Sequence, residues 1–536
     1  MRFHILVTDG VDPEGTALLT AVPEFEVDEV PTLPAEELLA RIGAYHAIIG
    51  RSATRISEKL LRAATNLRVV GRAGVGVDNV AVDAATALGV AVINAPAGNT
   101  IAVAELFFAS LIGLVRHVPR AHQSLREGRW ERAHLLGSEL HGRTLGIVGV
   151  GRIGSAVAMR ARAFGMTLIG YDPYISDERF DGLRVRRCST LGELLDACDV
   201  VTVHTPLTDE TTGMIGQPEL ARLRRGAIVA NLARGGIVDE AALIEALSGG
   251  HLGGATIDAF TGEPLKGEHA FRNVPNVLLT PHIGASTAEA QRNVAVDVCA
   301  AVRDALLNND ISRSLNVAES GESWQALESA MLVARRAASV ARARLAEQGA
   351  PVISSITVRL GPDLAQGRGP ILAAAALGAL EGILERGRLN LINSCAVATS
   401  RGIELRYAEG GEAPHARAIE VRVGAGSQEM RIGGVAALDA PPRLTRIGDF
   451  HVDVAPRGTL IVLTNRDVPG VIGHVGTALG DARVNIAEYH QARLAQGGDA
   501  LAMISVDGAV GDDVRSMLLA LPEVRTATIV QFGKES

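Results

Sequence analysis

Three side chains that could carry out chemistry together each follow a segment with the pattern of a buried strand: Arg234, Glu263 and His282. Loops at the carboxyl ends of neighbouring parallel strands meet at one edge of an open α/β sheet, so we expect the three to lie close together. A guanidinium can hold a carboxylate through two hydrogen bonds. An imidazole can accept an alcohol proton while a carboxylate orients the ring. The set predicts proton transfer next to a bound anion.

Spacing alone leaves other interpretations open. The chain has 14 histidines, and His204 also ends a predicted strand. A loop Arg or Glu is more often a solvated surface charge, and a His between Pro and Gly can simply belong to a turn.

A second pattern, TLGIVGVGRIGSAVAMRARAFGMTLIGYD at 144–172, reads as strand, glycine-rich turn, helix, strand and terminal acid. Gly149, Gly151 and Gly154 fit G-x-G-x-x-G, in which the glycines allow a tight turn, close approach of a pyrophosphate and close helix packing, respectively. The helix N-terminus attracts phosphate. Asp172 can accept hydrogen bonds from a ribose diol and would repel a 2′-phosphate, which favours NAD over NADP.

The elements that must position these residues form an alternation of strands and helices, which predicts parallel sheets covered by helices. A long apolar helix at about 101–118 is expected to lead into the nucleotide unit, and a helix at 289–307 to return the chain to the first unit. Beyond residue 310, helical patterns at 324–348 and 371–386 precede a β-α-β-β-α-β pattern typical of a ferredoxin-like fold.

The predicted fold class is therefore α/β, with a flavodoxin-like domain into which a Rossmann domain is inserted, followed by an α+β domain and a ferredoxin-like βαββαβ domain. The predicted boundaries are 1–98 with 287–310, 99–286, 311–453 and 457–536.

The composition of the chain excludes several classes of function. The chain has 536 residues, a net charge of −8 and a pI near 6.0, with no basic tract, which argues against nucleic-acid binding. Its four cysteines show no metal-ligand spacing and fit a reducing compartment. The N-terminus has no signal-peptide pattern, and the apolar stretches 101–115 and 371–384 are too short or carry an acid. We expect a cytoplasmic protein without metal or membrane partner.

LARGGIVDE, GEP and PHIGAST, following GVGRIG in this order, resemble the D-isomer-specific 2-hydroxyacid dehydrogenase family over about the first 310 residues. The resemblance implies that His282 is the acid/base, Glu263 its partner and Arg234 the substrate-orienting cation. It also implies NAD contacts at Gly149, Gly151, Arg152, Ile153, Gly154, Asp172, Thr205, Ala233, Asp258 and Gly284.

GRSAT at 50–54, GRAGVGVDN at 71–79 and NAPAGNT at 94–100 resemble the D-3-phosphoglycerate dehydrogenase branch of that family. The resemblance implies that Arg51, Arg72 and Asn99 meet the substrate. A phosphorylated hydroxy acid carries an anionic group at each end, so a site that binds it needs a cation at each end. The other interpretation of these arginines is structural salt bridging.

NRDVPGVI at 465–472 and VNI at 484–486 resemble an ACT domain, a small fold that binds amino acids. Asn465, Asp467 and Asn485 match serine-contacting positions, which implies an L-serine effector. A purely dimerising module is the alternative. Residues 311–453 resemble the intervening, allosteric substrate-binding domain of long-form members.

Together these resemblances imply NAD-dependent oxidation of 3-phosphoglycerate to 3-phosphohydroxypyruvate, the first step of L-serine synthesis, by a homodimer or homotetramer. Trp130 and Arg132 sit where such enzymes reach into a neighbour's site. The alternatives are a glyoxylate or hydroxypyruvate reductase of the same family and a non-enzymatic NAD-sensing scaffold.

Overall fold

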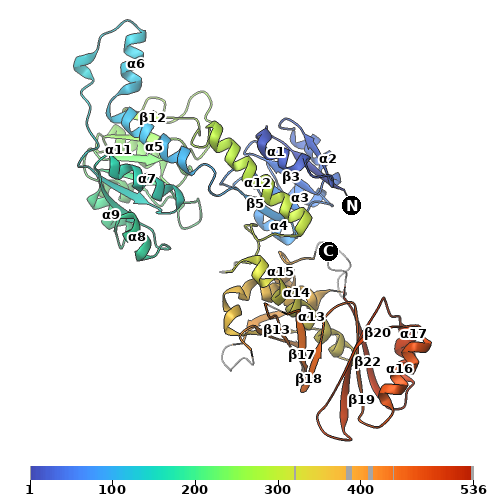
Figure 1. Ribbon diagram of the computed structural model, residues 1–536. Helices are drawn as coiled ribbons and strands as arrows, with labels where there is room; N and C mark the ends of the chain where they lie inside the picture. The colour runs from blue at the N-terminus through green and yellow to red at the C-terminus, as the bar shows by residue number, and fades with distance from the viewer. Residues whose placement is uncertain (1, 319–321, 382–388, 409–414, 439, 533–536) are drawn as a thin grey trace.

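The computed structural model describes residues 2–318, 322–381, 389–408, 415–438 and 440–532, and these residues form four β-sheets. Figure 1 shows two α/β lobes in the upper part of the molecule, joined by α12 (Ala288–Asn308), and the two remaining sheets below them.

The first lobe is a parallel sheet of order β2-β1-β3-β4-β5. Its strands β3, β4 and β5 are short apolar runs buried on both faces, as covered parallel strands require. The strands are β1 Phe3–Val7, β2 Phe25–Glu29, β3 Ala47–Gly50, β4 Val69–Arg72 and β5 Ala91–Asn94. The helices are α1 Pro13–Thr20, α2 Ala35–Arg41, α3 Glu58–Ala63 and α4 Val82–Ala87.

The second lobe holds a seven-stranded parallel sheet of order β12-β11-β10-β9-β6-β7-β8, the strand arrangement of a Rossmann-like α/β fold. Its strands are β6 Thr144–Val148, β7 Thr167–Tyr171, β8 Arg186–Arg187, β9 Val200–Val203, β10 Ile228–Asn231, β11 Gly254–Ile257 and β12 Val277–Leu279. Its helices are α5 Thr100–Val115, α6 Val118–Arg126, α7 Arg152–Ala163, α8 Asp177–Leu183, α9 Leu191–Ala197, α10 Gln217–Arg222 and α11 Glu240–Ser248. The predicted α/β class with parallel sheets is confirmed.

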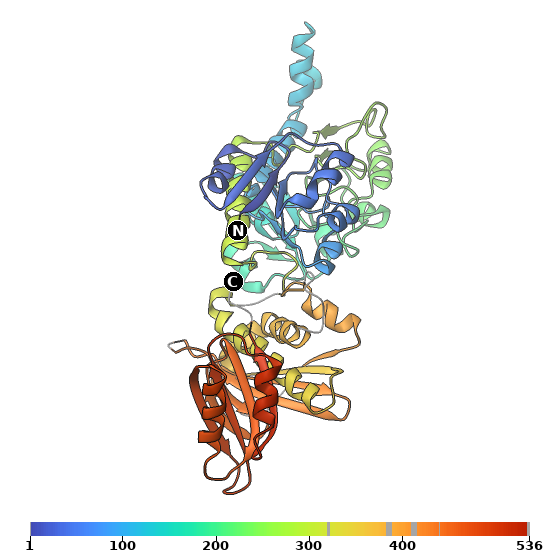
Figure 2. The same cartoon turned by 90° about the vertical axis from the view of Figure 1, so that its right-hand side faces the viewer.

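The predicted helix at 101–118 is interrupted. α5 ends at Val115, and His117 adopts a left-handed φ of 53° before α6 begins at Val118. α5 packs on α7, β11 and β12, whereas α6 projects away from the lobe (Figures 1 and 2). Among the described residues no single helix is long and apolar enough to span a membrane, and α5 with α6 meet the length and composition test only as a pair bent by 63°.

α12 returns the chain to the first lobe, as predicted. It packs along α1 and against β4 and β5, and the side chain of Thr287 caps its first turn by accepting the Ala290 N–H. The segment that follows also belongs spatially to the first sheet, because Ser314 bridges Ile93 and the Asn316 side chain bonds to the backbone of Val90 and Val92.

The third sheet has the order β14-β13-β15-β16-β17-β18 and the fourth β20-β21-β19-β22. The third contains β13 Ser355–Leu360, β14 Glu404–Tyr407, β15 Ala418–Ala425, β16 Gln428–Val435, β17 Arg443–Ile447 and β18 Phe450–Val454, with α13 Trp324–Glu347, α14 Arg368–Leu380 and α15 Ser394–Ser400. The fourth contains β19 Thr459–Arg466, α16 Val471–Asp481, β20 Ile486–Arg493, β21 Asp499–Val506, α17 Asp512–Leu519 and β22 Val524–Gln531, in the predicted β-α-β-β-α-β order. The end of the predicted helix at 371–386 lies outside the described residues.

Candidate active site

The carboxyl edge of three neighbouring strands brings the candidate catalytic loops together. β10, β11 and β12 are adjacent and parallel, with Asn231 opposite Ile257 and Ile257 opposite Leu279. The next residues in each chain segment form the loops that carry Arg234, Glu263 and His282. Gly235 allows two of these loops to touch, because a Cβ there would lie 2.0 Å from the backbone carbon of Phe260.

His282 and Glu263 form a direct pair. The His282 Nδ1 lies 2.7 Å from Glu263 Oε2, and the other carboxylate oxygen accepts the Phe260 N–H at 2.9 Å. With Nδ1 engaged by the carboxylate, Nε2 is the ring nitrogen available to a substrate proton. Both side chains are partly exposed, at 46% for the histidine and 35% for the glutamate, so a ligand can reach them.

A buried carboxylate shapes the His282 loop. Asp258 is 1% exposed, and its Oδ1 accepts hydrogen bonds from the Thr280 hydroxyl and the Ile283 N–H, while Oδ2 accepts the Gly284 N–H. His282, between these anchors, has a left-handed φ of 54°. The structure therefore gives both Asp258 oxygens partners within this loop.

Arg234 bridges the two α/β lobes. Its Nε donates to Asp78 Oδ2 at 3.0 Å, and Asp78 lies in the loop after β4 of the first lobe. A Cβ at Gly76 would lie 1.8 Å from Arg234 Nη2, so the absence of a side chain there makes room for the guanidinium. The Asn231 amide bonds to the Arg234 carbonyl and the Ala233 N–H, which holds the turn that presents Arg234.

The glycine loop between β6 and α7 has three different environments. Gly149 has a φ of 87°, and a Cβ there would lie 2.8 Å from the His204 carbonyl oxygen. A Cβ at Gly154 would lie 2.1 Å from the Gly149 oxygen, whereas a Cβ at Gly151 would meet nothing within 4 Å. The outer two glycines thus permit close packing, and the middle one faces open space at the start of α7. Arg152 and Ile153 form the first turn of that helix.

Other predicted nucleotide residues surround this loop. Asp172 follows β7 and accepts the Val150 N–H at 2.9 Å and the Tyr174 N–H at 3.0 Å. The Thr205 Oγ1 and the His204 Nδ1 are buried without a hydrogen-bond partner. Burial also lowers the pKa of His204 to about 4, so this ring is uncharged near neutral pH.

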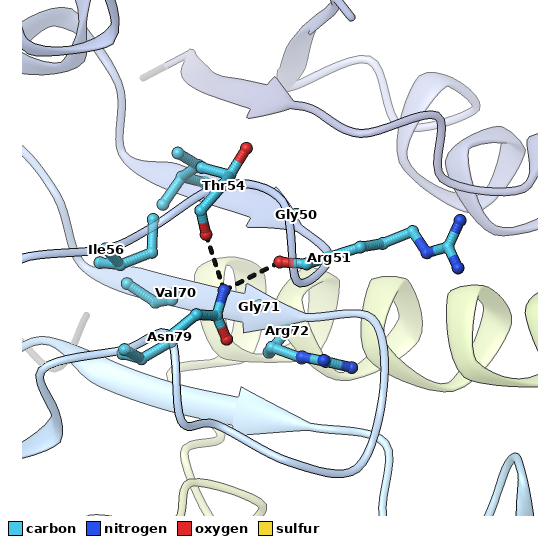
Figure 3. Close-up of a pocket in the computed structure, with 10 residues that line it drawn as sticks. Gly50, Arg51, Thr54, Ile56, Val70, Gly71, Arg72 and Asn79 are labelled. Carbon is cyan, nitrogen blue, oxygen red and sulfur yellow. Dashed lines mark hydrogen bonds between the residues drawn. The ribbon is translucent and has the colours of Figure 1, made fainter. Parts of the chain in front are cut away.

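Two arginines of the first lobe lie on neighbouring strand ends. Gly50, just before Arg51, is paired with Arg72, and Figure 3 shows both side chains extending in the same direction past a small pocket. Burial, with Arg234 and Arg51 nearby, lowers the pKa of Arg72 to about 10. Arg72 Nε and Asn99 Oδ1 are both buried without a hydrogen-bond partner.

The three predicted effector residues lie in two separate parts of the fourth sheet. Asn465 and Asp467 lie at the end of β19, where Asn465 is opposite Ala500 and Asp467 is bonded to Arg493. Asn485 is bonded to Asp507, next to Val506 at the other end of β21. Six residues of strand separate the two ends, roughly 20 Å. Within one chain, Asn485 therefore lies apart from Asn465 and Asp467.

The structure adds residues that the sequence patterns did not indicate. Asp78, Asn231 and Thr280 all bond to a predicted site residue, yet none stands out by type or spacing. In the described part of the chain, no three His, Cys, Asp or Glu side chains lie close enough together to hold a metal ion.

This chain is similar to known proteins in sequence and in fold. Residues 108–284 match the family described as D-isomer specific 2-hydroxyacid dehydrogenase, NAD binding domain. D-3-phosphoglycerate dehydrogenase of Synechocystis is 37% identical over 98% of this chain and 94% of its own length, and that of Bacillus subtilis is 36% identical over 99% and 100%. The crystal structure of the TT0316 protein from Thermus thermophilus covers 57% of this chain and 97% of its own, with 36% identity and a TM-score of 0.53. The chain therefore belongs to the D-3-phosphoglycerate dehydrogenase family, within the D-isomer specific 2-hydroxyacid dehydrogenases.

Proposed function

We propose that this protein oxidises 3-phosphoglycerate to 3-phosphohydroxypyruvate with NAD, the first step of L-serine synthesis. The observation that carries the proposal is the His282–Glu263 pair at the same sheet edge as Arg234, which itself reaches the lobe that carries Arg51 and Arg72. That arrangement suits a substrate with a hydroxyl between two anionic ends.

His282 takes the hydroxyl proton at Nε2, while Glu263 holds the ring through Nδ1 and stabilises its charged form. Arg234 orients the substrate carboxylate, replacing part of its contact with Asp78. Arg51, Arg72 and Asn99 bind the phosphate end, and the buried Arg72 Nε, a donor without a partner, supports this assignment.

NAD, when bound, supplies the hydride acceptor. Open space at Gly151 and the start of the 12-residue helix α7 fit its pyrophosphate. Asp172 fits the ribose diol. The buried Thr205 hydroxyl has no hydrogen-bond partner, which supports a place for NAD near the same glycine loop. Arg152, Ile153, Ala233, Asp258 and Gly284 complete the proposed cofactor site, Asp258 chiefly by holding the loop of Gly284.

Steady-state kinetics with purified protein tests the assignment. We expect turnover of 3-phosphoglycerate with NAD, and reduction of 3-phosphohydroxypyruvate with NADH at a kcat/KM well above those for glyoxylate and hydroxypyruvate. A preference for either unphosphorylated acid would instead identify a reductase of the same family, and absence of turnover on every acid would favour an NAD-sensing scaffold.

We further propose that the fourth sheet, with α16 and α17, is an ACT regulatory domain and that the third sheet is the intervening domain. The separation of Asn485 from Asn465 and Asp467 supports a serine site at a seam between two copies, each giving part of it. Exposed Trp130 and Leu136 beyond α6 support a homo-oligomer. Four free cysteine thiols support a cytoplasmic location.

Light scattering and activity assays with L-serine test these proposals together. We expect a dimer or tetramer whose turnover falls when L-serine is added, with the loss reduced in Asn485→Ala. An oligomer that is indifferent to L-serine would support the dimerising alternative, and a monomer would contradict both.

A further inference from the structure

We infer that Asp9 and Asn79 are positioning residues that hold the backbone of Arg51 from its two sides and thereby aim its guanidinium at the substrate phosphate. The inference rests on the proposed function, because it gives Arg51 the phosphate as its partner.

Asp9 holds the amide side of Arg51. It follows β1, and its Oδ2 accepts the Arg51 N–H at 2.7 Å and the Thr54 N–H at 3.0 Å. Its Oδ1 accepts the hydroxyls of Thr54 at 2.7 Å and Thr32 at 2.8 Å. Burial raises the pKa of Asp9, but these hydrogen bonds outweigh it and the pKa is lowered overall, so the carboxylate stays charged at neutral pH.

Asn79 holds the carbonyl side. Its Nδ2 donates to the Arg51 oxygen at 2.9 Å and to the Thr54 oxygen at 2.6 Å, as Figure 3 shows. The peptide groups before and after the Arg51 Cα are thus both bonded, one to each residue. Fixing both peptide planes fixes φ and ψ at Arg51, and with them the direction of its Cα–Cβ bond.

The segment from Gly50 to Thr54 is closely packed, which agrees with a fixed backbone path at Arg51. Thr54 is 3% exposed and its hydroxyl also lies 3.0 Å from the Thr8 hydroxyl. A Cβ at Gly50 would lie 2.7 Å from the Thr8 Oγ1, so the chain approaches the end of β1 as closely as a residue without a side chain permits.

The loop needs such restraint because three cations converge on it. Arg51 and Arg234 are near enough to lower the pKa of Arg72. Within the described residues, the Arg51 guanidinium makes no hydrogen bond or ion pair. Without an anion, like charges would push Arg51 away from Arg72. Bonds to the backbone resist this displacement and leave the guanidinium free for phosphate.

Asp9→Asn tests the inference, since it keeps the shape but turns an NH₂ group toward N–H donors. We expect kcat/KM for 3-phosphohydroxypyruvate to fall about tenfold, mostly through KM, while kcat/KM for hydroxypyruvate changes less than about twofold. Asp12→Asn is the matched control: that carboxylate also accepts a backbone N–H, from Glu14, but it does so at the start of α1. We expect this control to leave both substrates unaffected.

A double-mutant cycle with Arg51→Ala separates positioning from general support. In the Arg51→Ala background, Asp9→Asn is expected to cause no further loss on the phosphorylated substrate. Equal losses on both substrates, or an undiminished loss in that background, would overturn the inference.

Asn79→Ala provides a second variant should Asp9→Asn fold poorly, as monitored by thermal unfolding, and it is expected to show the same substrate-selective loss. The two proposals fail in different ways. If Arg51→Ala is selective for the phosphorylated substrate but neither positioning variant is, only the inference fails. If Arg51→Ala itself shows no selectivity, the phosphate assignment fails and takes the inference with it.

Discussion

The carboxyl edges of the two parallel sheets are organised in opposite ways. At the edge of the second lobe, His282 is bonded to Glu263, and Asp258 holds the loop around it. At the edge of the first lobe, Arg51 and Arg72 lie on neighbouring strand ends, neither guanidinium forms an ion pair among the described residues, and it is the backbone of Arg51 that is bonded.

The difference follows from what each edge has to do. A group that transfers a proton must be aligned before substrate arrives, and a permanent carboxylate partner provides that alignment. A group that binds an anion keeps more of its charge available when no permanent partner competes with the ligand, which holds for Arg51 but not for Arg234, which is bonded to Asp78. In the second lobe both the main chain and the reacting side chain are held, whereas in the first lobe only the main chain of Arg51 is held.

The largest expected loss of activity comes from a substitution at the carboxyl edge of the second lobe, where the proton acceptor is aligned. His282→Ala should lower turnover about a thousandfold, because the proton acceptor is lost. NAD binding, measured by calorimetry, should be retained, since the glycine loop is untouched. Near-normal turnover would show that another group, such as His204, accepts the proton.

The next largest effect is expected from removing Arg72, a cation that forms no ion pair among the described residues. Arg72→Ala should lower kcat/KM for 3-phosphohydroxypyruvate about a hundredfold, the order expected for losing a largely desolvated charged contact. Hydroxypyruvate should be affected far less. Equal losses on both substrates would mean that Arg72 supports the lobe rather than binding phosphate.

A matched pair of glycines sharpens the same contrast within the second lobe. Gly151→Ala adds a methyl group in open space, so it should leave the melting temperature unchanged and raise KM for NAD about tenfold. Gly154→Ala forces a methyl group against the Gly149 oxygen and should cost about 1–3 kcal/mol of stability. Thermal unfolding and NAD titration measure the two effects, and a reversed outcome would contradict the place given to the pyrophosphate.

The smallest predicted effect is a pH dependence of phosphate recognition. The pKa of Arg72 lies near 10 in this structure, and only the protonated form attracts an anion. As pH rises through that value the cation is lost, so kcat/KM for the phosphorylated substrate should fall about fourfold at about pH 10.5 relative to hydroxypyruvate at the same pH. A parallel decline for both substrates would assign the loss to another group.

Much of this site could be predicted from sequence because its parts are local. The glycine loop lies within a single strand-turn-helix unit, and Arg234, Glu263 and His282 each follow a strand whose apolar run is easy to recognise. Parallel pairing then brings those strand ends to one edge. These are relationships that short stretches of sequence encode directly.

What could not be predicted depends on contacts between distant segments. Asp9 meets Arg51, Asn79 meets the same residue from the other side, and Asp78 meets Arg234 across 156 positions of the chain. β2 was not predicted, because this edge strand is mostly exposed and lacks a clear apolar run. The break at His117 was not predicted, because the helix was expected to continue to Val118.

The bridge between Arg234 and Asp78 has a consequence for motion. The aspartate side chain is 61% exposed, and solvent-exposed pairs of this kind contribute at most about 1 kcal/mol. Thermal fluctuations can therefore rupture it readily, and salt weakens it further. The two lobes touch here without being locked, so a hinge opening wide enough to admit a ligand or release a product meets almost no electrostatic resistance at this point.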